Sequence, residues 1–550
     1  MIFFHILLFI ISIILLSLSI SGYGRLFQLK IKNFFFLDIF LGLVIITLIT
    51  TILHFFFKIN LFISFIIFNL GILLFFYKQK INFYEVLKFK SVYYFIIVVL
   101  FVPIFLSQKY HEDFGYYHLP YALAFVEEKI IFGFANIDKS YIYNSIWLNL
   151  YSIFFLANKD FNFLTLPSFL LFVSFVLFCL HHLILQNKKS ISDYFLLIAL
   201  FYFILKFTRI SEFGVDLPAA IFSILTIYYY LKFSEIDLMP ERKEYFFLIL
   251  IFSIFSILIK LSTIPLILLP MFLYLKYFKV LKTDTFKVKF LFIYFLLITF
   301  FIQQFIYTGC ILFPSNLTCS NVSWFSNDNI NLSNQLELIN KGYFSLAKDI
   351  YTPEEYLDNF KWFGFWLKRN YIEISEHLLT IALPVIFFLF FLKNKINHKF
   401  IFNNKLGLYL FLISGFLFWL NFSPVYRFAI HIFLTLIFVI FISFLISKNF
   451  SKKIFLIFVM TFVFYSFSKN ILRLNKVDNI FLGVKKIENK YVLNDYSGNQ
   501  LIKIYRPDVE NNSKNGWQGR LCWNIPFICS YNKLDIKKKN GYFIINKLIN

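Results

Sequence analysis

The chain has 550 residues, of which 59% are hydrophobic and only 15% are charged. Soluble domains rarely have this composition, because so many apolar side chains would leave them with an apolar surface. The formal net charge of +23 could indicate a nucleic-acid partner, but the lysines are scattered between hydrophobic runs and form no basic domain. The composition therefore predicts a polytopic membrane protein with no nucleic-acid partner.

Apolar runs of membrane-spanning length recur from the first residue to about Phe467. They predict an all-α bundle of about fourteen transmembrane helices. The expected spans are residues 2–20, 34–57, 61–77, 92–107, 163–186, 194–206, 217–232, 246–261, 263–278, 290–308, 377–392, 406–421, 428–447 and 454–467.

The distribution of basic residues predicts which connections face the cytoplasm. Residues 1–20 have no basic segment before their apolar run, and the first basic residues follow it, which favours an N-terminus outside the cytoplasm. Every second short connection then carries lysine or arginine. The remaining connections, 108–160, 207–216 and 309–376, and the tail from about 468, are expected outside. We thus expect a transmembrane domain at 1–467 and a small, partly β extracytoplasmic domain at 468–550, where runs such as YVLND and YFIIN resemble short strands.

The first expected outside loop is where charge, histidine and aromatic residues first gather. His111, Glu112 and Asp113 follow directly on an apolar run. Leu119, Leu123, Val126 and Ile130 then recur at helical spacing, which predicts an amphipathic helix lying on the membrane surface. We expect a second such helix at 141–155 and a third in the segment TPEEYLDNFKWFGFWLKRNY of the 309–376 loop.

The five cysteines fit this arrangement. Cys310 with Cys319, and Cys522 with Cys529, form close pairs within two expected outside segments, whereas Cys179 lies inside a span. Close pairs in an oxidising compartment predict two local disulfides. The alternative is four free thiols.

Ionisable residues at or inside the outer membrane boundary are costly and indicate a functional site. They are Glu112, Asp113, Lys206, Arg209, Glu212, Asp216, Lys260 and Arg427. Two acidic positions and several cations could hold a phosphate, directly or through a divalent cation bound by Asp113 and Asp216, while a carboxylate accepts a proton.

Each of these residues also has a structural interpretation. Asp216, before Leu217-Pro218, is well placed to cap a helix, and Asp113 could cap the helix that contains Pro120. Lys260 and Arg427 could extend to lipid head groups.

Several motifs resemble the GT-C superfamily of polyprenyl-phosphate-sugar-dependent glycosyltransferases. The acidic residue that opens an outside loop after a span resembles theirs, as do the lysine turn LIKLSTIPLILLP and the Arg-aromatic entry to a late span, SPVYRFAIHIF. EDFGYYHLPYALAFVEEKIIFGFAN, YNSIW, FGVDLPAA and the terminal CWNIPFIC resemble a family of bacterial membrane proteins thought to be GT-C-like. Two features differ from the superfamily: about three extra spans precede the acidic loop, and Lys260 is followed by Leu261-Ser262 instead of glycine.

The resemblance implies a GT-C-like bundle in the bacterial inner (cell) membrane that moves a sugar from a lipid-linked donor to an extracytoplasmic acceptor. Asp113 would be the base, supported by Asp216 and Glu112, or these acids would hold a divalent cation. The donor phosphate and its surroundings would be contacted by Lys260, Arg427, Arg209, His118 and Tyr117.

Two other functions fit a protein with many spans. An O-antigen or capsule polymerase or ligase would depend on arginines in its large outside loop, but 309–376 contains only Arg369. A lipid or polysaccharide transporter would need charged or Gly/Pro-broken spans and usually internal symmetry. Pro265, Pro270 and Pro384 are the candidate breaks.

Overall fold

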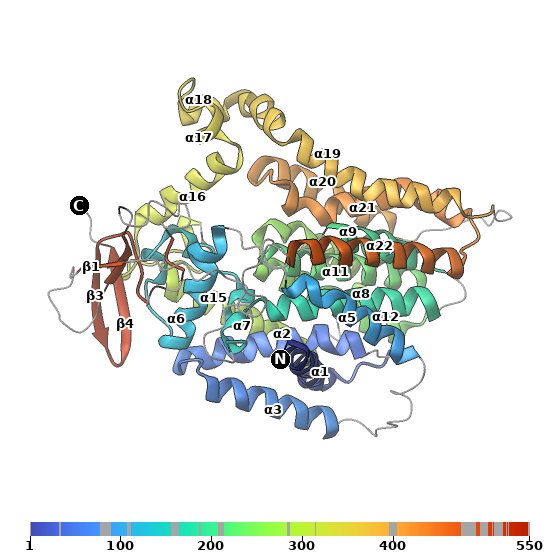
Figure 1. Ribbon diagram of the computed structural model, residues 1–550. Coiled ribbons are helices and arrows are strands. Elements are labelled where there is room, and N and C mark those ends of the chain that lie inside the picture. The colour runs from blue at the N-terminus through green and yellow to red at the C-terminus, as the bar shows by residue number, and fades with distance from the viewer. Residues whose placement is uncertain are drawn as a thin grey trace.

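The computed structural model describes residues 2–31, 35–77, 90–106, 112–155, 164–185, 189–206, 214–282, 287–313, 315–394 and 404–474, together with 491–494, 504–508, 510, 521–523, 525 and 527–547 of the tail. Most of its long apolar helices run roughly along one common axis (Figure 1). Short helices and the strands of the tail gather at one end of them. The fold is thus a helical bundle with an elaborated end.

Three helices at the N-terminus pack with very close backbones. They are α1 (Ile2–Gly24), α2 (Phe35–Phe56) and α3 (Leu61–Tyr77). A Cβ added at Gly22 would lie 2.0 Å from the carbonyl oxygen of Gly71, and one at Gly42 would lie 1.8 Å from that of Ile20. Small residues are what allow transmembrane helices to approach this closely. These glycines therefore set the packing of the first three helices.

The other helices of the bundle follow in chain order, together with the short helices at their breaks. They are α5 (Lys90–Leu106), α8 (Leu166–Leu185), α9 (Ile191–Lys206), α11 (Asp216–Glu235), α12 (Met239–Ile259), η6 (Leu261–Ile267), α13 (Leu268–Lys276), α14 (Phe278–Leu281), α15 (Val288–Thr308), α19 (Lys361–Phe390), α20 (Lys405–Phe422), η9 (Tyr426–Ala429), α21 (Ile430–Ile446) and α22 (Lys452–Leu474). Within the described residues, nine helices are long and apolar enough to cross a membrane, and three shorter apolar stretches accompany them. The polytopic helical class is confirmed, but this measure does not give the expected count of fourteen.

Hydrogen bonds at the ends of the helices fall into two sets, one near the connections expected in the cytoplasm and one near those expected outside. In one set, Arg25 after α1 donates from Nη1 to the carbonyl oxygen of Phe75 at 3.3 Å, and Lys276 donates to Oδ1 of Asn404 at 2.6 Å. In the other, the N–H of Ile59 after α2 donates to the carbonyl oxygen of Phe125 at 2.8 Å. Phe125 belongs to the first expected outside loop, 108–160, which we call the acidic loop. Both sets agree with the alternation expected from the basic residues. The orientation in the membrane rests on that bias and stays a prediction.

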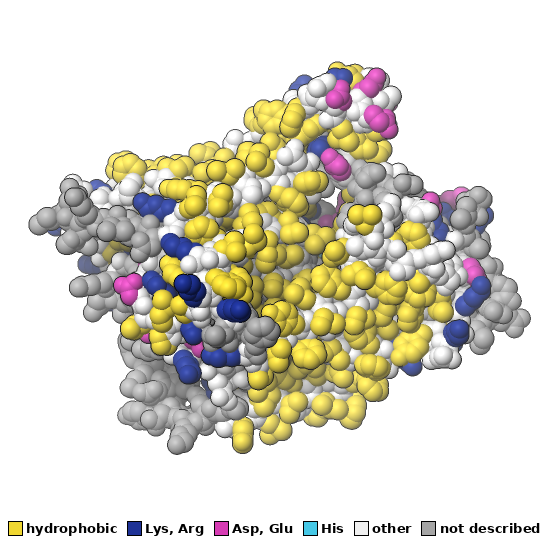
Figure 2. Space-filling model, turned by 180° about the vertical axis from the view of Figure 1, so that it is seen from behind, with side chains coloured by type: hydrophobic (Ala, Val, Ile, Leu, Met, Phe, Trp, Pro, Cys, Tyr) yellow, Lys and Arg dark blue, Asp and Glu magenta, His cyan; other side chains and the backbone are white. Residues whose placement is uncertain are grey.

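The surface has a broad apolar belt. Figure 2 shows hydrophobic side chains across the middle of one face, with Lys and Arg gathered beyond one edge. A belt of this kind suits contact with lipid acyl chains, and cations at its edge suit the head-group region.

The acidic loop folds into five short elements: η2 (Phe114–His118), α6 (Leu119–Glu127), η3 (Phe134–Asn136), η4 (Lys139–Tyr141) and α7 (Ile146–Ile153). The prediction that its helices lie on the membrane surface was wrong, because all eight residues of α7 and the first seven of α6 are buried. Helical spacing indicated one apolar face, but the polar residues between the apolar ones are also buried and are hydrogen-bonded.

A buried polar network holds this loop against two membrane helices. Asn149 of α7 accepts from the Tyr121 hydroxyl at 2.8 Å and donates to Thr51 Oγ1 of α2 at 2.8 Å. It also donates to Gln303 Oε1 of α15 at 3.0 Å, and Gln303 donates to the Tyr307 hydroxyl at 3.0 Å. Satisfied polar groups in a low-dielectric interior fix a single arrangement, since each lost partner leaves a costly buried donor or acceptor.

The 309–376 loop contains η7 (Asn316–Thr318), α16 (Asn327–Asn340), α17 (Tyr343–Leu346), α18 (Pro353–Leu357) and η8 (Asp358–Phe360). Its last predicted helix is not a separate interfacial element. Its first part forms α18, the chain kinks at Asn359 and Phe360, and the part from Lys361 continues into the next span as the 30-residue helix α19. Thr352 caps α18 in a capping box with Glu355, so the chain begins its return to the bundle there.

The tail is partly β, as expected. Strand β1 (Tyr491–Asn494) pairs antiparallel with β2 (Ile504–Pro507), and β3 (Leu534–Lys539) pairs antiparallel with β4 (Tyr542–Lys547). The second hairpin lies on the acidic loop, where the N–H of Ile545 donates to the carbonyl oxygen of Phe132 at 2.8 Å. The tail and the acidic loop therefore lie at the same end of the bundle (Figure 1).

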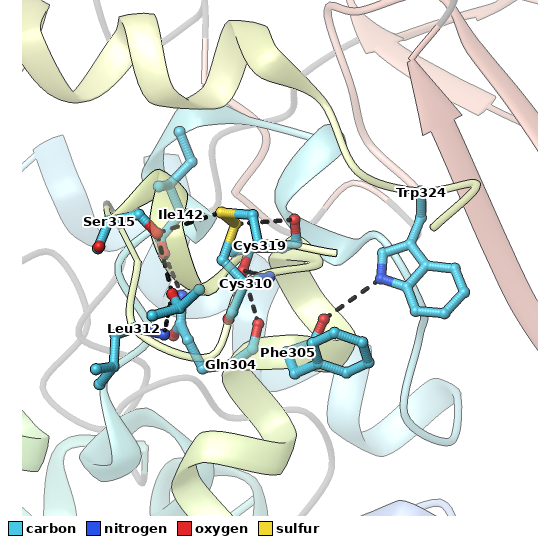
Figure 3. The surroundings of a disulfide bond; sticks show 10 residues. Ile142, Gln304, Phe305, Cys310, Leu312, Ser315, Cys319 and Trp324 are labelled. Atoms are coloured by element: carbon cyan, nitrogen blue, oxygen red, sulfur yellow. Dashed lines mark hydrogen bonds between the residues drawn. A yellow bond between two sulfur atoms is a disulfide. The ribbon is translucent and has the colours of Figure 1, made fainter. Parts of the chain in front are cut away.

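Both expected disulfides are present, Cys310–Cys319 and Cys522–Cys529, and Cys179 is free and buried. Figure 3 shows the first of them above the end of α15, where Gln304 Nε2 donates to the carbonyl oxygen of Ile142 at 3.0 Å. The bridge closes a short loop that packs on the acidic loop, so both disulfides stabilise the same end of the bundle.

The disulfides predict a simple labelling result. Unreduced, denatured protein should react with a maleimide at one thiol, that of Cys179, because the other four cysteines are paired. Mass spectrometry of the labelled peptides measures this, and reduction before labelling is the control that should give five. Labelling of all five without reduction would show that the pairing is wrong.

The two sets of connections predict the membrane topology. Reporter fusions after residues 340 and 547 should show an extracytoplasmic location, and fusions after 282 and 448 a cytoplasmic one, since the latter follow basic connections. Opposite locations for the fusions at 340 and 547 would contradict the ion pair that joins the tail to the 309–376 loop, in which Nζ of Lys547 lies 2.9 Å from Oδ2 of Asp328.

Candidate functional site

The candidate site is a charged cluster where three helix ends meet. Asp216 is the first residue of α11, Lys260 occupies the break between α12 and η6, and Arg427 lies in η9 before α21. Lys260 has extended backbone angles (φ −153°, ψ 117°), which end α12 and turn the side chain out of the helix. The sequence thus places each charge at an interruption of an apolar helix, where the side chain can leave the acyl-chain region.

Asp216 joins the two cations. The Lys260 ammonium contacts Oδ1 of Asp216, and Nε of Arg427 lies 3.0 Å from Oδ2. The Asp216 side chain is only 6% exposed, whereas those of Lys260 and Arg427 are 18% and 23% exposed. A carboxylate buried to this extent needs both partners, because an unpaired buried charge is strongly unfavourable.

Asp113 is the fourth member and the most accessible one. Its Oδ2 lies 3.8 Å from Nη2 of Arg427, and its side chain is 34% exposed. The pair is therefore looser than the pairs of Asp216. Of the two aspartates, Asp113 is the one that a substrate hydroxyl can reach.

The alternative interpretations of these residues are not supported. The cap position of α11 is Val215 and not Asp216. Asp113, which precedes η2, makes no side-chain capping hydrogen bond. Lys260 and Arg427 contact Asp216 instead of extending away to lipid head groups. Four of the eight side chains that the sequence singled out at this boundary therefore converge.

Aromatic side chains surround the cluster. Lys260 Nζ lies 3.2 Å from the ring centroid of Phe428, a cation–π contact. Burial, with the charges of Asp113 and Asp216, raises the pKa of the Tyr117 phenol well above its usual value. Tyr117 thus remains a protonated hydroxyl beside the acids.

Sequence reasoning did not find three of the neighbours. Phe428 and Tyr426 flank Arg427, and the ring of His377 in α19 lies 4.5 Å from that of Tyr426. His377 also hydrogen-bonds through Nδ1 to the Tyr202 hydroxyl at 2.6 Å. The aromatic residues on both sides of Arg427 in SPVYRFAIHIF were the available signal for the first two.

Two tryptophans hold the turn that carries Arg427. Trp366 Nε1 donates to the carbonyl oxygen of Pro424 at 2.6 Å, and Trp419 Nε1 donates to that of Val425 at 2.8 Å. The turn has few backbone hydrogen bonds of its own, so these donors from α19 and α20 fix the position of the guanidinium.

The other predicted residues lie differently. His118 is buried against Gly214, where an added Cβ would lie 2.4 Å from its Cε1 atom, so it packs the start of α11 instead of facing a substrate. Glu112 is exposed at the start of the loop. Arg209 and Glu212 lie outside the described residues.

The cluster is a poor fit for the divalent cation considered above. Each carboxylate oxygen of Asp216 already faces a cationic group, which would repel a metal ion. Among the residues that the structure describes, no group of three or more His, Cys, Asp or Glu side chains is arranged to hold a metal.

The fold and the site define a polytopic helical membrane protein with a charged cluster at one end of its bundle. The chain belongs to the DUF8201 family, described as a domain of unknown function, whose model matches residues 1–434. The match contains the four charged residues and stops before the tail. No curated protein and no solved structure matches the chain.

Removing the central carboxylate should destabilise the protein. Asp216→Ala removes the carboxylate that lies between Lys260 and Arg427, which should cost about 3 kcal/mol and lower the melting temperature in detergent. The matched control is Asp237→Ala, which removes the partner of Arg242 from a pair whose carboxylate side chain is 98% exposed. That variant should melt like the parent. Equal melting of all three proteins would show that the Asp216 pairs contribute nothing.

Proposed function

We propose that this protein is a GT-C-type glycosyltransferase that moves a sugar from a polyprenyl-phosphate donor to an extracytoplasmic acceptor. The observation that carries the proposal is the convergence of Asp113 and Asp216 with Lys260 and Arg427 at one end of the bundle. Two cations for a phosphate and one accessible carboxylate for a hydroxyl are the groups that glycosyl transfer from a lipid phosphate needs.

The site is open to a lipid-borne substrate. Lys260 is followed by η6, whose Leu261 and Ile264 side chains are exposed. An acyl or prenyl chain can lie along such side chains while its head group reaches the cations. This arrangement supports lateral entry from the membrane.

The donor phosphate would bind at Arg427 and Lys260. Both cations are already paired with carboxylates, and the 3.8 Å contact between Arg427 and Asp113 is the one most easily replaced. A phosphate that takes this position on Arg427 also releases Asp113 towards the acceptor. Negative charge grows on the leaving phosphate as the sugar becomes oxocarbenium-like, so the same cations stabilise the transition state more than the ground state.

Asp113 would then act as the base. The acceptor oxygen forms a bond to the anomeric carbon, the bond from that carbon to the phosphate oxygen breaks, and the proton of the acceptor hydroxyl passes to Asp113. The lipid phosphate leaves with the electron pair. Asp216, enclosed by the two cations, is a positioning residue that keeps them at the donor side.

The disulfides support an extracytoplasmic site. Both lie in segments packed at the same end as the cluster, and disulfides persist in oxidising compartments. With the basic connections at the other end, this favours a cell-membrane enzyme that works on the outer side.

The proposed base can be tested with a substitution that preserves shape. Asp113→Asn cannot accept a proton, so transfer from a polyprenyl-phosphate sugar should fall by about two or more orders of magnitude. Binding of farnesyl phosphate in phosphatidylcholine nanodiscs should not weaken, because Asn removes a negative charge beside Arg427. Transfer assays and titration of the lipid measure the two effects.

Arg427→Ala is the comparison variant. It should weaken farnesyl phosphate binding as well as transfer, because the guanidinium contacts the phosphate in the ground state and in the transition state. Near wild-type transfer by Asp113→Asn would contradict the assignment of the base, because Asn keeps the shape of the side chain but cannot accept a proton.

A further inference from the structure

The tail contacts the candidate site through one tryptophan. The N–H of Trp523 donates to the carbonyl oxygen of Gly115 at 2.9 Å, and Gly115 is two residues after Asp113. The indole covers the Cα of this glycine so closely that an added Cβ would lie 2.3 Å from its Cε2 atom. The ring centroid of Trp523 also lies 6.2 Å from that of Phe114. Both residues between Asp113 and Tyr116 are therefore in contact with Trp523, Gly115 through the backbone N–H and the indole of Trp523 and Phe114 through the indole.

Trp523 is itself firmly fixed. It is 4% exposed and follows Cys522 of the Cys522–Cys529 disulfide. Its backbone has φ +44°, in the left-handed region that a tryptophan rarely adopts. Such a conformation is unfavourable and persists only where the surroundings determine it. Those surroundings here are the disulfide loop and the acidic loop.

The disulfide loop and the residues just after it bind the acidic loop at several further points. The N–H of Phe527 donates to Oε2 of Glu127 at 3.3 Å, and Ser530 Oγ donates to the carbonyl oxygen of Ile137 at 2.8 Å. Asn532 Nδ2 donates to the carbonyl oxygen of Asn136 at 3.0 Å. The tail thus contacts the acidic loop at several points between η2 and η3.

The start of this loop needs such support. Asp113 precedes η2, a single stretch of π-helix, and π-helical turns are marginal by themselves and common at functional sites. We propose that Trp523 is a positioning residue that holds Asp113 beside Arg427, so that the tail completes a site whose other residues lie in the family domain. The role in transfer rests on the proposed function, whereas the placement of residue 113 can be tested without it.

The first experiment uses a thiol at position 113. In Asp113→Cys the new cysteine is the accessible thiol, since Cys179 is buried and the other four cysteines are paired. We measure its rate of reaction with a methanethiosulfonate reagent in detergent. Adding Trp523→Ala should raise the rate by about threefold or more, because the segment opens locally more often. Trp523→Phe, which keeps a ring over Gly115, should leave the rate close to that of Asp113→Cys alone.

A second tryptophan of the same end supplies the matched control. Trp324 packs on the ring of Phe132 with centroids 5.0 Å apart and donates to the carbonyl oxygen of Phe305 at 3.4 Å. Trp324→Ala therefore removes a comparable contact from the acidic loop without touching Gly115, and should leave the rate unchanged. If Trp523→Ala does not fold, Gly115→Ala displaces the indole from the other side. Equal rates for the parent, the Trp523 variant and the Gly115 variant would overturn the proposal.

The second experiment asks whether the placement matters to the site. With Trp523 present, Asp113→Asn should tighten farnesyl phosphate binding by about threefold or more, because it removes a charge that competes for Arg427. With Trp523→Ala, where Asp113 is no longer held there, the same change should have no effect. A merely structural role of Trp523 would leave the effect of Asp113→Asn unaltered, and that result would reject the positioning role.

The two proposals fail in different ways. If no variant binds farnesyl phosphate, the donor site and the proposed function are wrong, and the thiol reaction still decides whether Trp523 holds residue 113. If binding occurs but Asp113→Asn acts equally in both backgrounds, the donor site stands and the role of Trp523 is wrong.

Discussion

The ion pairs of Asp216 are the interaction on which the rest of the site depends. A single buried carboxylate joins a cation from the break after α12 to a cation from the turn before α21. Charges at the edge of an apolar bundle are tolerated only when their partners are in place. The pairs therefore fix the positions of three helix ends relative to one another, and they do so where a phosphate could replace one partner. The same contacts thus stabilise the fold and prepare the site.

The parts of the molecule that are not membrane helices serve this arrangement. Hydrogen bonds of Asn149 to Thr51 and Gln303 hold the acidic loop on the membrane helices α2 and α15. The tail contacts the same loop through further hydrogen bonds. The turn of Arg427 is held by Trp366 and Trp419. Each support is a polar group satisfied inside an apolar environment, where a hydrogen bond has few competitors. This explains why amide and indole donors gather at one end of a helical bundle that is otherwise mostly apolar.

The residues of the site could be predicted from the sequence more completely than the parts of the fold that surround them. Asp113, Asp216, Lys260 and Arg427 could be predicted because a charge at the end of an apolar run is costly and rare, so each one stands out locally. The all-helical class and the paired cysteines had local signals too. The burial of α6 and α7 had none, because spacing shows which residues are apolar but not that Asn149 finds partners on α2 and α15. The continuation of the segment after Lys361 into the next span as the 30-residue α19 was also hidden, since aromatic residues suit an interface and a helix interior equally. The contact of Trp523 with Gly115 depends on the tertiary fold alone.

The order of the charges along the chain has a consequence for membrane insertion. Asp216 and Lys260 are 44 residues apart and belong to helices α11 and α12, which are neighbours in sequence and pack together. This hairpin can enter the membrane with its anion and cation already neutralising each other, long before η9 has been synthesised. Arg427 is synthesised later, when Asp216 can already be paired with Lys260, and in the topology expected from the basic residues it then meets Asp113, which was synthesised first. The neutral pair within one hairpin thus reduces the charge that this hairpin has to carry into the bilayer.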